Sequence, residues 1–338
     1  MIDINVTIDG IVLFCDESVV GIHLGNGYVF GKKAFDDLSF KNKIIDGVGN
    51  ISINYLGSRI FDENDKVFFI CLHKNDVYQA ELPEVKNGET MVMTDSDLMC
   101  DNQVQLYKDR EVGYLYKMFS LLRLFKQGNI GYKELFLTHT FRVVGFMDNT
   151  QKQTNIDLDQ NIVDTTIYSL TDDEIVRCNQ FLQDYSGREY DLLKNSIDEF
   201  VWGLDQTDEP TGFEQYTTAL EMTLLDVDQQ GKKQVLSKRV AVLLGTTPTE
   251  VANIYNKMTR FYRYRSESLH EGDGSNITGL ELKDLEEIVR NVLVKYLAYC
   301  KVQVSNNPTI TWEEIKNAKM TELKNQVLLE IGAGVLPA

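Results

Sequence analysis

The character of the sequence changes near residue 170, and this change constrains the fold more than any other feature. Before it, β-branched and apolar residues alternate with polar ones in short runs, separated by turn formers such as Gly25-Asn26-Gly27. This pattern is typical of strands. After it, apolar residues recur at helical spacing behind repeated helix-start signals. The sequence therefore predicts an α+β chain, with a β-rich domain over 1–170, an all-helical domain over 171–305 and a C-terminal helix over 306–338.

Individual elements follow from the same patterns. In the first part we expect one helix at 111–126, together with strands at 2–8, 11–15, 19–24, 51–56, 67–73, 103–107, 134–146 and 162–169. In the second part we expect a helix that begins at Thr171, followed by helices at about 188–203, 213–229, 236–245, 248–270, 280–300 and 312–331. Three of these begin with a Thr followed three residues later by a Glu: Thr171 with Glu174, Thr247 with Glu250, and Thr311 with Glu314. This spacing is typical of a capping box.

Charge is distributed unevenly along the 338 residues. The chain has 34 basic and 51 acidic residues, a net charge of −17, which as a whole repels nucleic acid and anionic membranes. Residues 1–211 hold 19 basic and 35 acidic residues, whereas residues 212–300 hold 11 and 12. Within the later region, Lys257, Arg260, Arg263 and Arg265 alternate with aromatic residues. This cluster is either an anion-binding site or a solvated basic helix face.

Several classes of protein are disfavoured. The five cysteines are scattered, without a C-x-x-C, and the four histidines lack ligand spacing, so we expect no disulfide framework, no metal site and no other cofactor. No apolar run approaches the roughly 18 residues that a membrane span needs. The first residues show no secretory pattern. We therefore expect a cytoplasmic protein without membrane contact.

Three further motifs suggest a chemistry that their spacing supports poorly. The glycines from Gly25 to Gly31 are spaced wrongly for a phosphate loop and favour a hairpin turn. The acidic run that begins at Asp62 lacks the Gly and the Glu of a calcium loop. Glu84 and Lys86, after Asp76, weakly suggest a metal-dependent nuclease, an alternative that stays open.

The helix predicted from Pro248 carries the strongest chemical signal. Its apolar residues form one stripe, with Arg265 at the stripe's edge: Val251, Ile254, Tyr255, Met258, Tyr262 and Leu269. A guanidinium in this position needs an acidic partner, because an unpaired buried charge is costly. We expect this partner to be Glu221. Ser266 and His270 share a neighbouring face, and a histidine close to an arginine suits phosphate-ester chemistry.

Residues 213–300 resemble the ApeA-like branch of the HEPN superfamily. The resemblance rests on Ala219-Leu220-Glu221, on the run Leu236 to Leu244, and on Tyr262 to Gly272, which contains an R-x4-H motif from Arg265-Ser266 to His270. It covers about a quarter of the chain. The chain departs from the family pattern at Glu271, which stands between the His and the Gly.

The resemblance implies a helical bundle that dimerises, with two R-x4-H motifs meeting at the interface. It also implies a metal-independent endoribonuclease that acts in phage defence, abortive infection or a toxin system. Arg265, His270 and Ser266 would be catalytic, Lys257, Arg260 and Arg263 would bind the RNA substrate, and the protein would be a homodimer. The domain over 1–170 would respond to an unknown trigger or partner. The alternative is a non-catalytic HEPN module that binds RNA or a partner protein.

Overall fold

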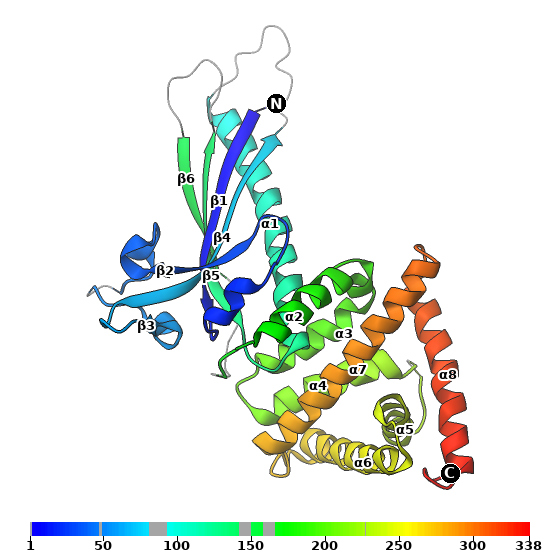
Figure 1. Ribbon diagram of the computed structural model, residues 1–338. Helices are drawn as coiled ribbons and strands as arrows, with labels where there is room; N and C mark the ends of the chain where they lie inside the picture. Colours follow the sequence, from blue (N-terminus) through cyan, green and yellow to red (C-terminus); the bar gives the residue numbers. More distant parts are fainter. Residues whose placement is uncertain (1, 47–48, 81–92, 142–149, 158–165, 227) are drawn as a thin grey trace. The chain divides into compact units, whose positions relative to one another are not determined.

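The computed structural model describes residues 2–46, 49–80, 93–141, 150–157, 166–226 and 228–338. These residues form two compact units. The first, the sheet unit, comprises residues 1–119, 128–160 and 165–180, and the second, the helical unit, comprises residues 120–127, 161–164 and 181–338. The α+β class predicted from the sequence is confirmed, with an antiparallel sheet followed by helices (Figure 1).

The sheet unit is built on one antiparallel sheet in the order β2-β4-β1-β5-β6, with β3 paired to β4. The strands are β1 (Ile2–Leu13), β2 (Val29–Ala34), β3 (Ile60–Phe61), β4 (Val67–Ala80), β5 (Gly131–Phe141) and β6 (Thr150–Asp157). Short 3-10 helices connect them at Glu17–Gly21, Phe35–Asp37, Lys41–Lys43 and Ile53–Ser58. The long β1 and β4 lie side by side, with Asp9 opposite His73.

One face of the sheet is covered by the long helix α1 (Met93–Phe125) (Figure 1). Tyr107 of α1 stacks on Tyr78 of β4, with ring centroids 4.7 Å apart, and Phe119 of α1 packs on Tyr132 of β5 at 5.0 Å. The opposite face is partly covered by the connections, because Phe40 stacks on Phe136 at 4.4 Å. The core of the unit therefore lies on both sides of β1, β4 and β5.

Several local expectations for this half were wrong. Residues expected as strands at 19–24 and 51–56 contain 3-10 helices, and 103–107 lies inside α1. Strand β2 was expected only as part of a hairpin turn. Parts of the expected strands at 134–146 and 162–169 lie outside the described residues; Tyr168, which is described, forms an isolated bridge with Cys15.

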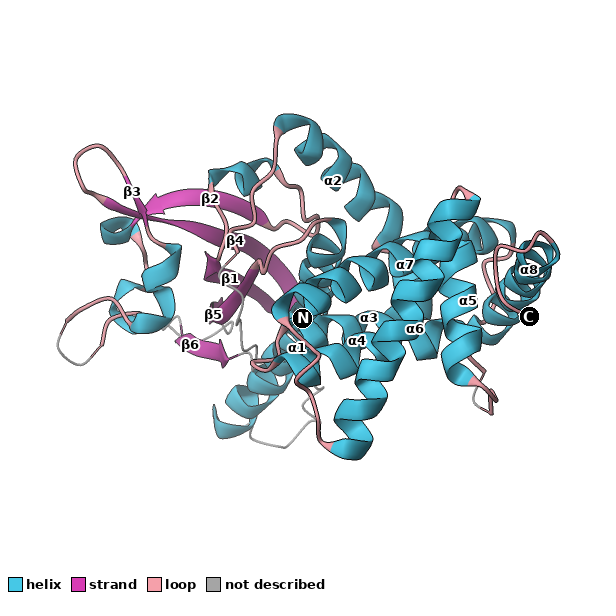
Figure 2. Cartoon of the chain, turned by 90° about the horizontal axis from the view of Figure 1, so that it is seen from below, coloured by secondary structure: helices cyan, strands magenta, loops and turns pink. Residues whose placement is uncertain are grey.

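The part of the chain after residue 170 contains the helices that were expected from the caps and periodicity, with shifted ends. They are α2 (Asp172–Tyr185), α3 (Arg188–Leu204), α4 (Glu209–Leu224), α5 (Lys232–Leu244), α6 (Pro248–Glu271), α7 (Gly279–Asn306) and α8 (Trp312–Gly332). Figure 2 shows this helix-only region. The first residues of α2 group with the sheet unit and its last residues group with the helical unit.

Aromatic residues from α3, α4 and α6 contribute to the core of the helical unit, which also contains buried residues of α5 and α7. Phe200 packs on Tyr216 with ring centroids 5.6 Å apart, and Phe213 meets the ring of Phe261 edge-on at 5.5 Å. Helices α3 and α4 approach closely at Gly203, where an added Cβ would lie 2.5 Å from the Tyr216 ring. Only residues 205–208 separate α3 from α4, and a short connection of this kind is typical of a helical bundle. None of the helices described is long and apolar enough to cross a membrane.

Candidate functional site

The candidate site lies on α6, which is a regular helix with well-formed ends. Thr247 accepts a hydrogen bond from the backbone N–H of Glu250, and Pro248 occupies the first helical position. At the other end, Gly272 adopts a left-handed conformation with φ of 69°, which a residue with a side chain rarely adopts. The helix therefore continues through Glu271 and does not end before His270.

Arg265 is anchored by an acidic residue of a neighbouring helix, as predicted. Its Nη1 lies 3.2 Å from Oε1 of Glu221 in α4, and the Arg265 side chain is 18% exposed. The Tyr262 ring lies beneath the guanidinium, with 5.6 Å from Cζ to the ring centroid. In the described part of the chain, the buried Nε of Arg265 has no hydrogen-bond partner. The guanidinium is thus held in place, with the N–H of its buried Nε left without a partner.

Glu221 gathers three donors. The Tyr262 hydroxyl donates to its Oε1 at 2.9 Å, and Nζ of Lys232 in α5 lies 3.5 Å from Oε2. Burial, followed by the hydrogen bond and the charge of Glu221, raises the pKa of Tyr262 to about 12. Two cations face one carboxylate, so this cluster keeps a net positive charge at neutral pH.

His270 and Ser266 are exposed. His270 lies in the last turn of α6, and Leu269 beside it is 44% exposed. Because α6 is regular, Arg265 and His270, five residues apart, project about 140° apart around the helix axis. One chain therefore does not direct the two side chains of the R-x4-H motif to the same point.

The expected apolar stripe of α6 is partly correct. Val251 and Met258 are buried, but Leu269 is exposed, and Phe261, which the stripe omitted, is 1% exposed. Phe261 was missed because it stands among charged and aromatic residues, and its burial depends on contact with Phe213 of α4.

The three residues expected to guide RNA have different environments. Nζ of Lys257 lies 2.7 Å from the carboxylate of Asp284 in α7, and Arg263 forms an i,i+4 ion pair with Glu267 at 3.4 Å. Arg260 is exposed, with its guanidinium over the Phe261 ring at 5.5 Å. Surface ion pairs of this kind are weak, so all three cations remain accessible to a polyanion.

The motifs set aside in the sequence have ordinary structural roles where they are described. Gly25-Asn26-Gly27 forms a turn that leads into β2, and all three residues have positive φ. Asp62 accepts backbone hydrogen bonds from Asn64 and Lys66 in the turn before β4. Glu84 and Lys86 lie outside the described residues. Within the described segments, no group of three or more His, Cys, Asp or Glu side chains has the arrangement of a metal site.

Two cavities of the helical unit lie away from the R-x4-H motif. One, of about 680 Å³, is lined by residues of α6 and α7 that include Lys257 and Asp284. The other, of about 670 Å³, lies between α5 and α8 and is lined by Arg239 and Lys324. Sequence reasoning missed the second cavity, because its residues come from two distant segments of the chain, 226–239 and 317–327.

Comparison with known proteins gives no match: no family model, no curated protein and no solved structure is similar to this chain.

Proposed function

We propose that the protein is a metal-independent endoribonuclease of the HEPN type, acting in the cytoplasm in phage defence, abortive infection or a toxin system. The observation that supports the proposal is the environment of Arg265 and His270, the two motif residues on α6. The Arg265 guanidinium is fixed by Glu221 while its side chain stays partly exposed, and His270 is exposed at the helix end. An oriented guanidinium and an accessible imidazole can supply the charge stabilisation and the proton transfer that cleavage by the ribose 2′-hydroxyl needs.

In the proposed reaction, His270 removes the proton of the 2′-hydroxyl while water protonates the leaving 5′-oxygen, or His270 protonates the 5′-oxygen while water takes the 2′ proton. The 2′-oxygen forms a bond to phosphorus while the bond from phosphorus to the 5′-oxygen breaks, which leaves a 2′,3′-cyclic phosphate and a 5′-hydroxyl. Arg265 stabilises the charge that develops on the phosphorane oxygens. Ser266, one helical turn before His270, orients the imidazole or the phosphate.

The geometry of α6 favours a site shared by two chains. Because Arg265 and His270 project about 140° apart on one helix, a complete site needs Arg265 of one chain and His270 of another. A homodimer with a two-fold axis near the ends of α6 would form two such sites. The exposed Leu269, next to His270, would be covered in this dimer.

RNA would approach along the outer surface of α6, where Lys257, Arg260 and Arg263 provide positive charge. The acidic residues of the first 211 positions repel RNA elsewhere on the chain. This repulsion would restrict cleavage to RNA that engages α6, and the sheet unit would receive the trigger that releases the activity.

A second candidate is a non-catalytic HEPN module that binds RNA or a partner protein. Its supporting observation is the same ion pair, because Glu221 neutralises part of the Arg265 charge that catalysis would use. In this case α6 would be a recognition helix, and His270 would contribute only to binding.

RNA cleavage in the presence of EDTA separates the two candidates. The wild-type chain should cut RNA, leave a 2′,3′-cyclic phosphate and spare a DNA of the same sequence, which lacks the 2′-hydroxyl. His270→Ala should lower the rate by about 10²–10⁴-fold. His23→Ala, at an exposed histidine of the sheet unit, is the matched control and should cut normally. Equal cleavage by the His270→Ala and His23→Ala variants would contradict the enzymatic proposal, and RNA binding without cleavage would favour the second candidate.

A metal-dependent mechanism gives a different result in the same experiment. Cleavage abolished by EDTA would favour the metal-dependent alternative at Glu84 and Lys86.

A further inference from the structure

The cavity between α5 and α8 has a charge that differs from that of the whole chain. Three cationic side chains and one carboxylate line its wall of ten residues: Asp226, Gln229, Val235, Lys238, Arg239, Asn317, Met320, Thr321, Lys324 and Val327. The protein as a whole has a net charge of −17. A hollow with excess positive charge in an acidic protein concentrates anions in its vicinity.

Arg239 is the centre of this cavity. The residue is 9% exposed, and burial lowers the pKa of its guanidinium. Nη1 donates to the backbone carbonyl of Leu224, but Nη2 lies 3.9 Å from Oδ2 of Asp226, beyond hydrogen-bond distance. Asp226 is itself 54% exposed, so water screens this ion pair. Arg239 is therefore desolvated without a carboxylate in hydrogen-bond contact. An anion bound in the cavity would give its guanidinium a negatively charged partner.

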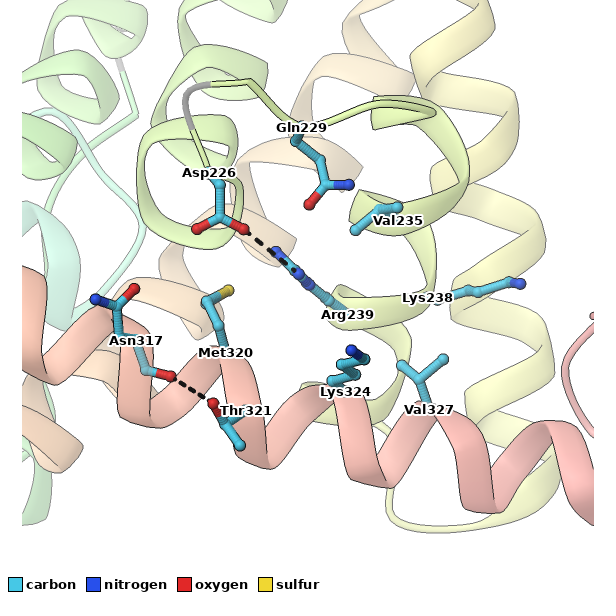
Figure 3. Close-up of a pocket in the computed structure, with 10 residues that line it drawn as sticks. All are labelled: Asp226, Gln229, Val235, Lys238, Arg239, Asn317, Met320, Thr321, Lys324 and Val327. Atoms are coloured by element: carbon cyan, nitrogen blue, oxygen red, sulfur yellow. Dashed lines mark hydrogen bonds and ion pairs between the residues drawn. The ribbon is translucent and has the colours of Figure 1, made fainter.

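Lys324 provides a second cation that can reach the same anion. Figure 3 shows Lys324 and Met320 extending from α8 toward the side chain of Arg239, while Gln229 and Asp226 come from the opposite side. Lys238 extends away from Arg239 in this view. Because an arginine fork and a lysine ammonium both bind phosphate oxygens, this pair fits a phosphate group.

The remaining wall of the cavity is suited to the rest of an organic ligand. Val235, Met320 and Val327 offer apolar surface, and Gln229 and Asn317 offer amide groups that can donate and accept hydrogen bonds. A volume of about 670 Å³ lies within the range of small-molecule sites, about 300–1,000 Å³. Charge, apolar surface and size together match a nucleotide better than inorganic phosphate alone.

We propose that the cavity between α5 and α8 binds a phosphorylated small molecule of mononucleotide size, with Arg239 and Lys324 holding its phosphate. The site is separate from the R-x4-H motif and does not depend on the proposed ribonuclease activity. The cavity joins α5 to the C-terminal helix α8. Val327 of α8 and Leu336, which follows α8, also pack near Ala241 of α5. Occupancy would thus stabilise the attachment of α8 to the unit.

Calorimetric titration of the full chain with AMP, GMP, CMP and UMP tests the proposal, with inorganic phosphate and the matching nucleosides as comparison ligands. We expect at least one mononucleotide to bind, and its nucleoside and inorganic phosphate each to bind at least tenfold more weakly. Lys324→Gln should weaken this binding at least fivefold, because Lys324 is exposed and its loss removes one phosphate contact without a core change. Lys283→Gln, at an exposed lysine of α7 outside the cavity, is the matched control and should bind as the wild type does.

Asp226→Asn gives a result of opposite sign. Removing the one carboxylate of the cavity wall leaves Arg239 free for the ligand, so the mononucleotide should bind more tightly than to the wild type. The proposal is overturned if no mononucleotide binds, or if Lys324→Gln and Asp226→Asn leave the Kd unchanged. It is also overturned if a short RNA without a terminal phosphate binds as tightly, since the cavity would then be part of an RNA surface.

Discussion

The guanidinium of Arg265 in α6 lies 3.2 Å from the carboxylate of Glu221 in α4. This ion pair joins two of the three segments on which the HEPN resemblance rests, the Ala219-Leu220-Glu221 run and the segment with the R-x4-H motif. Arg265 therefore has a structural role whether or not it takes part in catalysis. Its contribution to stability can be separated from that of its exposed neighbours.

Arg265→Ala should destabilise the helical unit by about 1–3 kcal/mol, because it leaves the partly buried Glu221 without its closest cation. Arg263→Ala removes only an exposed i,i+4 pair with Glu267 and should cost less than about 0.5 kcal/mol. Urea unfolding followed by tryptophan fluorescence measures this difference, since Trp202 and Trp312 are the only tryptophans and both belong to the helical unit. Equal losses of unfolding free energy in the two variants would show that the pair between Arg265 and Glu221 stabilises the fold no more than an exposed ion pair does.

The ion pair between Arg265 and Glu221 could be predicted from the sequence, because it follows from the apolar periodicity of the helix and from the need of a buried cation for an acidic partner. Periodicity places Arg265 at the edge of an apolar stripe, and a buried cation requires an acid. The opposite situation occurs in α1, where residues 103–107 were expected as a strand. The buried seam of α1 contains Val104, Tyr107 and Glu111, and a buried glutamate interrupts the apolar period. Only the sheet reveals why Glu111 is buried, because its partner Lys74 lies on β4.

The ion pair between Lys74 and Glu111 leads to a prediction for the sheet unit. The two side chains are 3% and 1% exposed, with 2.7 Å between Nζ and Oε2, and Nζ also lies over the Tyr28 ring at 5.0 Å. Glu111→Ala should destabilise the sheet unit by about 3–5 kcal/mol, because it leaves a buried ammonium without its main partner. Lys74→Met combined with Glu111→Leu should recover much of this loss.

Urea unfolding followed by far-ultraviolet circular dichroism should show this loss of stability. The unfolding midpoint seen by tryptophan fluorescence, which reports on the helical unit, should shift less. A double variant no more stable than Glu111→Ala would indicate that packing around Tyr28 and Tyr107, not the uncompensated charge, sets the cost.

The raised pKa of Tyr262 predicts a dependence of stability on alkaline pH. In the unfolded chain a tyrosine ionises near pH 10, whereas Tyr262 in the folded chain stays protonated up to about pH 12. Between these values the unfolded state loses a proton that the folded state retains, so stability falls as the pH rises. The phenylalanine of the Tyr262→Phe variant cannot ionise, so this variant lacks the loss of stability that Tyr262 causes at alkaline pH.

At pH 7 Tyr262→Phe should be less stable than the wild type by about 1 kcal/mol, because the hydrogen bond to Glu221 is lost. The difference should shrink as the pH rises from about 10 to 12. Urea unfolding of both proteins at pH 7, 10 and 11 measures it, and the other tyrosines cancel because both proteins contain them. A constant difference across this range would contradict the raised pKa that burial and Glu221 give to Tyr262.

The shared active site makes the sharpest prediction about function. If Arg265 of one chain acts with His270 of its partner, then chains carrying Arg265→Gln and chains carrying His270→Ala are each inactive alone but complement each other when mixed. In a mixed dimer, one of the two sites contains both wild-type residues and the other contains neither. Half of the dimers in an equal, fully exchanged mixture are mixed, so the mixture should have about a quarter of the wild-type RNA-cleaving rate. If both residues acted within one chain, no dimer in the mixture would hold a complete site, and the rate would stay at that of the separate variants. The 140° separation of the two side chains on the regular helix α6 favours the first outcome, and RNA cleavage before and after mixing decides between them.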